Sequence, residues 1–221
     1  MQLIREIAFL LHKEFTLELR QKYALGGILL YVLATVYVVY ISFVKVDPAN
    51  WNTLFWIIIL FASVNAIARS FTQEHSNRQL YYYTLANPIA VLVAKILYNF
   101  LLLLLLCALT LGTYSVVAGY LIEQAGPFIW AIVLGSLGFS IALTFVSAIA
   151  SKASNTSTLM AILSLPLLIP ILATVIRLAK ASFIPKTGIE VSIKSDLYIL
   201  LGIDMLLLGA ALILFSFLWR D

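Results

Sequence analysis

Long apolar runs separated by short polar segments make up almost the whole chain. Six runs supply, or nearly supply, the ~20 residues that a helix needs to cross the hydrocarbon of a bilayer. They cover approximately residues 24–44, 51–68, 96–122, 128–150, 158–176 and 197–218. The runs lack the alternation of apolar and polar residues that is typical of a strand in a membrane barrel. The pattern therefore predicts an all-α integral membrane protein with six transmembrane helices.

The composition supports the same class. Hydrophobic residues make up 63% of the chain and charged residues 11%, against roughly half and about a quarter in a soluble domain. No internal repeat, low-complexity tract or soluble domain is visible, so we predict a single transmembrane domain over residues 1–221. We expect lipid around it and no nucleic acid as a partner. The lone cysteine, Cys107, falls within the third run, where apolar surroundings make a thiol inert.

The N-terminal segment has a helical pattern of its own. Its apolar residues recur at helical spacing with charges of both signs between them; they are Leu3, Ile4, Ile7, Leu11, Phe15 and Leu19. The pattern predicts an amphipathic helix in the membrane surface. The alternative is a solvated helix docked on the protein's own loops.

Positive charges set the predicted orientation, because cytoplasmic loops carry an excess of Lys and Arg. With the N-terminus inside, nine Lys and Arg residues fall on the inner side and five on the outer side. Four of those five lie in the last outer loop, between Arg177 and Lys194, against the trend. We predict that both termini are cytoplasmic, and that Trp51 and Trp219 are aromatic anchors near opposite interfaces.

The densest polar stretch, Arg69 to Pro88, lies between the second and third runs and is therefore predicted to be cytoplasmic. Ser70 or Thr72 is a candidate helix cap, and Pro88 after Asn87 marks the start of the next helix. Three consecutive tyrosines, Tyr81, Tyr82 and Tyr83, favour a protein interface. The alternative for at least one of them is anchoring at the lipid headgroups.

Two stretches carry a resemblance to a known family. FASVNAIARSFTQE, residues 61–74, and SLPLLIPIL, residues 164–172, resemble the CcmB family of permease subunits in the heme exporter of cytochrome c maturation. In the wider group of type-2 ABC exporter permeases, the loop after the second span contains a coupling helix that docks into the ATPase. The positions that match this permease pattern are Arg69, Glu74, Leu80, Leu85, Pro88 and Lys95. We expect the coupling role at Arg69, Glu74, Arg78, Leu80, Tyr81, Tyr82, Tyr83, Leu85 and Pro88.

The resemblance also implies the protein's partners. The chain contains no G-x-x-x-x-G-K-[ST] motif, which cradles ATP phosphates, so ATP is expected on a separate CcmA-like ATPase and this subunit is expected to be non-catalytic. A CcmC-like heme-handling subunit, a homodimer and the bacterial inner membrane are the further implications. The alternatives are a type-2 ABC permease for lipid, polysaccharide or drug, and a membrane scaffold that does not depend on ATP.

Heme is expected as a possible cargo and not as a resident cofactor. Heme iron binds His, Met, Cys or Tyr side chains, and the candidates that we considered are His12, His75, Met160, Met205 and Cys107. They are scattered along the chain, so we expect no cofactor-binding or metal site.

A few positions within the runs have chemistry unlike their surroundings. Asp204 lies inside the last run, where it is either a functional polar site or a partner in a hydrogen bond between helices. Pro166 and Pro170 predict a kinked or interrupted helix, which is either a hinge or ordinary packing. Asn65 and Asn99 are expected to form hydrogen bonds between helices.

Overall fold

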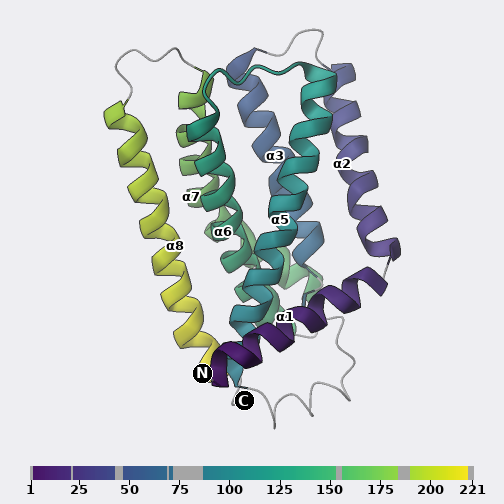
Figure 1. Cartoon of the computed structure of the whole chain (residues 1–221), viewed down its shortest axis with the longest axis vertical. Coiled ribbons are helices and arrows are strands. Elements are labelled where there is room, and N and C mark those ends of the chain that lie inside the picture. Colours follow the sequence, from purple (N-terminus) through teal and green to yellow (C-terminus); the bar gives the residue numbers. More distant parts are fainter. Residues whose placement is uncertain are drawn as a thin grey trace.

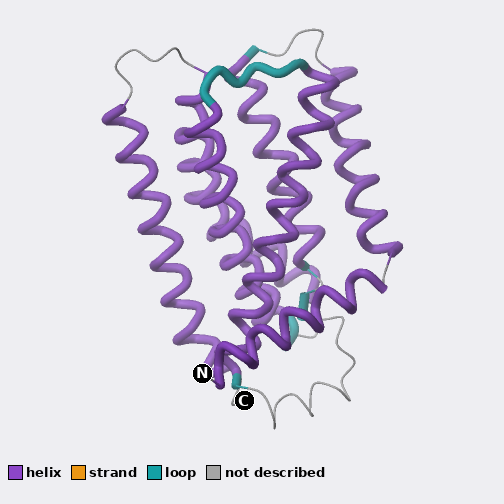
Figure 2. The backbone as a smooth tube through the Cα atoms, in the orientation of Figure 1, coloured by secondary structure: helices purple, strands orange, loops and turns teal. Residues whose placement is uncertain are grey.

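The computed structural model describes residues 2–20, 22–42, 47–68, 70–71, 87–152, 156–183 and 190–218. Across these ranges the secondary structure is helical and no strand occurs, which confirms the all-α class (Figure 2). The elements are α1 (Gln2–Arg20), α2 (Lys22–Ser42), α3 (Pro48–Ile67), α5 (Pro88–Ala118), α6 (Ala125–Ala150), α7 (Thr156–Lys180), the short 3-10 turn η1 (Ala181–Phe183) and α8 (Glu190–Leu218).

Within the described part of the chain, five helical segments are long and apolar enough to cross a membrane: Pro48–Ile67, Pro88–Ala118, Ala125–Ala150, Thr158–Phe183 and Ile193–Phe217. They correspond to five of the six predicted spans. The first predicted span coincides with α2, of which the stretch Leu29–Ser42 counts as a shorter apolar helix. The protein is therefore a multi-pass membrane protein, and the sixth span remains a prediction.

Helix α5 is shifted relative to the predicted third span, 96–122, whose membrane boundaries remain a prediction. Helix α5 begins at Pro88, as the Asn87–Pro88 pair indicated, and the Asn87 side chain accepts a hydrogen bond from the Ile89 N–H at 3.0 Å. Lys95 looked like a charge outside the membrane, but it lies inside the helix and is buried. The helix ends at Ala118 because Gly119 has a φ of 84°, a left-handed conformation that glycine adopts most readily.

The helices form a bundle with one element laid across it. In Figure 1, α2, α3, α5, α6, α7 and α8 run along the long axis, and α1 lies obliquely across the end where both termini are found. Helix α6 packs against α3, α5, α7 and α8. It is buried along most of its length and carries no charged residue. The core of the bundle is therefore built around α6.

Aromatic rings fill the opposite end of the bundle. Trp51 is fully buried and its Nε1 donates a hydrogen bond to the Gly119 carbonyl at 3.0 Å. The ring centroids of four residues lie within 6 Å of it: Phe55, Tyr114, Phe128 and Phe183. The Trp51 ring therefore does not contact lipid, because its neighbours enclose it, and its position near a membrane interface remains a prediction. Trp219 lies outside the described residues.

Helix α7 continues through both of its prolines, so it is not interrupted there, and the predicted kink remains a prediction. Each proline lacks the N–H that a helix normally donates to the carbonyl four residues earlier. The Thr174 hydroxyl donates to the Pro170 carbonyl at 2.8 Å, which adds a local hydrogen bond beside the second proline. A hinge role for Pro166 and Pro170 remains a prediction.

Candidate functional site

The structure describes the residues at the two ends of the segment that is predicted to couple to an ATPase. Pro88 is the first residue of α5. The other residues assigned to coupling lie outside the described part of the chain; they are Arg69, Glu74, Arg78, Leu80, Tyr81, Tyr82, Tyr83 and Leu85. Ser70 and Phe71 lead into the segment and Asn87 leads out of it. Their surroundings define the candidate site.

A buried lysine holds the entry to this segment. The Lys95 side chain is 2% exposed, and its Nζ donates a hydrogen bond to the Ser70 carbonyl at 2.6 Å. The same Nζ lies 3.3 Å from Glu14 Oε1 and 4.8 Å from the centre of the Phe71 ring. A buried ammonium group is tolerated where a carboxylate and hydrogen-bond acceptors compensate its charge. Lys95 therefore ties α5 to α1 and to the residues that follow α3.

Asn99, one turn further along α5, extends the contact to α6. Its Nδ2 donates to Ser70 Oγ at 3.2 Å and to Thr144 Oγ1 at 2.8 Å. The Ser147 hydroxyl of α6 donates to the Ala68 carbonyl at 3.4 Å. We call Glu14, Ser70, Lys95, Asn99 and Thr144 the polar node. It joins α1, α5 and α6 at the point where the chain leaves α3.

The two asparagines behave differently. Asn99 forms the predicted hydrogen bond between helices. The prediction for Asn65 was wrong, because its Nδ2 donates to the Phe61 carbonyl of its own helix at 3.0 Å and the residue is exposed. An exposed asparagine side chain readily donates a hydrogen bond to the backbone carbonyl one turn earlier in its own helix.

Helix α1 is attached to α5 by contacts of two kinds. Besides the Glu14–Lys95 pair, the Phe15 ring meets the Tyr98 ring edge-on, with centroids 5.3 Å apart. On its other side, α1 exposes Ile4 and Phe9, which are 73% and 72% exposed. The predicted helix is thus confirmed and is docked on the bundle. Its exposed apolar residues are also what a helix in the membrane surface needs.

The sequence contained no signal for the Glu14–Lys95 pair. The two residues are 81 positions apart, so neither helical spacing nor a motif relates them. In the sequence, Lys95 counted toward orientation and matched a position in the permease pattern. The fold shows that it also compensates a carboxylate on another helix.

The candidate intramembrane positions do not gather at the polar node. Asp204 lies in the interior of α8, is buried, and has no hydrogen-bond partner for either carboxylate oxygen among the described residues. No described residue donates a hydrogen bond to the Asp204 carboxylate, so the predicted hydrogen bond from another helix is not formed there. Pro166 and Pro170 are exposed on α7.

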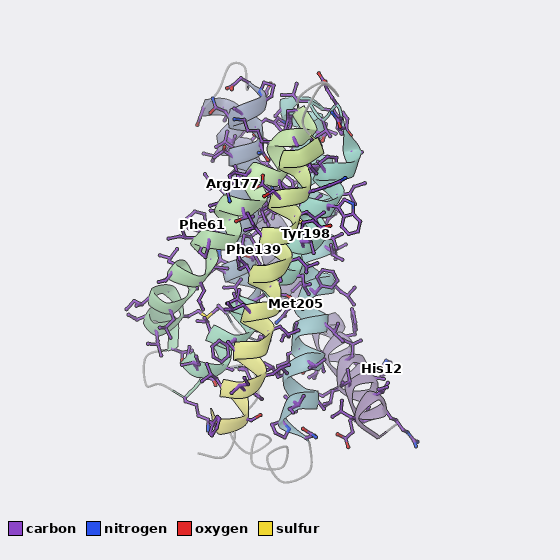
Figure 3. The ribbon with its side chains drawn as sticks, turned by 90° about the vertical axis from the view of Figure 1, so that its left-hand side faces the viewer. His12, Phe61, Phe139, Arg177, Tyr198 and Met205 are labelled. Atoms are coloured by element: carbon purple, nitrogen blue, oxygen red, sulfur yellow. The ribbon has the colours of Figure 1, made fainter. Side chains whose placement is uncertain are left out.

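The possible heme ligands are also separate. His12 on α1 and Met205 on α8 lie well apart in Figure 3. Met160 and Cys107 are buried in different helices, and Cys107 Sγ lies 3.5 Å from Ser136 Oγ. His75 lies outside the described residues. No three His, Cys, Asp or Glu residues cluster in the ranges that the structure describes.

Comparison with known proteins places the whole arrangement in a family. No curated protein matches the chain. A family model described as CcmB protein matches residues 5–218, a range that includes the polar node, both prolines and Asp204. The chain belongs to the CcmB family.

Proposed function

We propose that this chain is the membrane permease subunit of an ABC exporter for heme, and that it works in c-type cytochrome maturation with ATP hydrolysed by a separate subunit. The observation that carries the proposal is the match to the CcmB family over residues 5–218. That family comprises heme exporter permease subunits, and the apolar helices agree with a subunit that spans the membrane.

The polar node supports a mechanical role for the segment that precedes α5. A protein that pushes on residues 72–86 acts on a segment whose ends are Phe71 and Asn87. Just before Phe71, Ser70 is bonded to Lys95 through its carbonyl and to Asn99 through its hydroxyl. These two residues belong to α5, and Asn99 is bonded onward to α6. A displacement of the segment would therefore move α5 and α6 together with α1.

The same reasoning gives the proposed assembly. Two copies of this chain form a homodimer that faces two CcmA-like ATPase subunits, with a CcmC-like subunit handling heme. The termini share one end of the bundle with the entry to the coupling segment (Figure 1), and we assign this end to the cytoplasmic face of a bacterial inner membrane. Heme is cargo in this proposal, and none of His12, His75, Met160 or Met205 is an obligatory ligand.

The test is co-purification with the ATPase subunit. Glu74→Lys combined with Arg78→Glu reverses two charges in the coupling segment and is expected to abolish co-purification while the bundle remains folded. A matched control reverses the charges of Arg177 and Asp196, which lie 3.7 Å apart at the far end of the bundle. The control is expected to keep the ATPase. Equal recovery of the ATPase with both double variants would contradict the proposed docking segment.

A further inference from the structure

Asp204 is a buried carboxyl group within the apolar part of α8. The residue is 1% exposed, whereas its neighbours Met205 and Leu206 are 53% and 71% exposed. Figure 3 shows α8 along the side of the bundle that faces the viewer, with Met205 labelled on it. The exposed residues of α8 therefore face outward and Asp204 faces the bundle.

The carboxyl group lies where three helices meet. A Cβ atom placed on Gly138 of α6 would collide with Asp204 Oδ1, and it would lie 3.1 Å from Cγ2 of Ile171 on α7. The absence of a side chain at Gly138 is what makes room for the carboxyl group. Gly138 of α6 and Ile171 of α7 line this junction.

No positive charge faces Asp204 from the helices that pack on α8. Helix α6 contains no titratable residue, and the cations of α7, Arg177 and Lys180, are in its last turn. Arg177 is 3.7 Å from Asp196, which is two turns along α8, ~12 Å, from Asp204. On α5, Lys95 binds Glu14 and Ser70 near the level of Phe71. Phe71 meets Phe215 of α8, three turns from Asp204 in the other direction, ~16 Å.

The two forms of a carboxyl group fit this junction differently. The ionised form accepts hydrogen bonds and donates none, and neither Asp204 oxygen finds a donor in the described part of the chain. The backbone N–H groups inside α6 are already used by that helix. The protonated form carries an O–H that can donate a hydrogen bond. A helix carbonyl can accept it, because a carbonyl oxygen that already accepts one helical hydrogen bond has a second lone pair. An unpaired charge at this depth also costs several kcal/mol.

We propose that Asp204 is a proton-binding site at the junction of α6, α7 and α8, occupied in the closed bundle. Separation of α8 from α6 would admit water, and the Asp204 O–H proton would then pass to water and leave a hydrated carboxylate. Opening of this junction and release of one proton per chain are thus linked, since each must favour the other. The inference depends on the local packing and is independent of the proposed cargo.

Infrared spectroscopy tests the proposal on the full chain in lipid membranes, with any partner that co-purifies. Aspartate is labelled with carbon-13 at its carboxyl group, and the spectrum of Asp204→Asn is subtracted from that of the unchanged protein at neutral pH. The expected difference is the isotope-shifted C=O band of a protonated acid. Asp196→Asn, which removes a carboxylate paired with Arg177, is expected to remove carboxylate bands instead. Carboxylate bands in the Asp204 difference, without an acid band, would overturn the proposal.

A second variant keeps Asp204 itself unchanged. The chain has four aspartates, Asp47, Asp196, Asp204 and Asp221, so replacing the other three by asparagine leaves Asp204 as the labelled aspartate of this chain. The acid band must persist in this triple variant. Its absence would overturn the proposal even if Asp204→Asn fails to fold.

Discussion

At the scale of single residues, the contacts of Lys95 explain how a full charge is held inside a membrane protein. Its ammonium group has a carboxylate, a backbone carbonyl and an aromatic face as neighbours, contributed by α1 and by residues 70–71. Loss of one member of a buried pair leaves the other uncompensated, and this costs more than the pair contributes as a whole. The polar node should therefore respond asymmetrically to substitution.

Lys95→Met is expected to lower the free energy of unfolding by about 1 to 3 kcal/mol, below the value for a fully buried pair because Glu14 is 15% exposed. Thermal unfolding of the purified protein measures the loss. Adding Glu14→Gln should recover part of it, because it removes a half-buried carboxylate that has lost Lys95 and keeps Lys13, 3.2 Å away, as its cation. Lys194→Met, which changes an exposed lysine, is the matched control. If Lys95→Met and Lys194→Met unfold alike, the polar node does not stabilise the bundle.

At the scale of elements, close approach between helices depends on glycines of α6. A Cβ on Gly135 would lie 3.0 Å from Val175 Cγ2 of α7 and 3.2 Å from the Trp56 ring of α3. Gly138 plays the same part toward α7 and α8 through Ile171 and Asp204. Small residues at such contacts are typical of helix packing in membranes. The bundle therefore tolerates little growth on these faces of α6.

Gly138→Ala is expected to destabilise the protein by about 1 to 3 kcal/mol, because the added methyl group collides with the Asp204 carboxyl group. In an Asp204→Ala background the penalty should shrink, since the colliding atoms are gone. Gly202→Ala on α8 is the control: nothing lies within 4 Å of the added Cβ, and alanine favours a helix over glycine by ~1 kcal/mol. Thermal unfolding of the four variants measures the coupling. Equal effects of Gly138→Ala and Gly202→Ala would contradict the close packing.

At the scale of the whole molecule, the apolar runs predicted the five spans that the structure describes. A long uncharged segment is stable as a helix across the bilayer, because its backbone groups form their hydrogen bonds within the helix. The sequence did not predict burial that depends on distant partners. In the sequence, Lys95 marks the edge of the third apolar run, but in the structure it lies inside α5 beside Glu14 and Ser70. In the same way, the enclosure of the Trp51 ring depends on its ring neighbours on α5, α6 and η1. Of the predicted coupling segment, the structure locates Pro88 and the residues at its two ends.

The central claim is that this CcmB family member serves the export of heme for c-type cytochromes. The most direct measurement is covalently bound heme in c-type cytochromes of cells that lack this chain, with b-type cytochromes as the control. We expect covalent heme to be lost, b-type heme to be unchanged, and expression of the chain to restore the covalent heme. Full c-type heme attachment in the absence of the chain would contradict the claim.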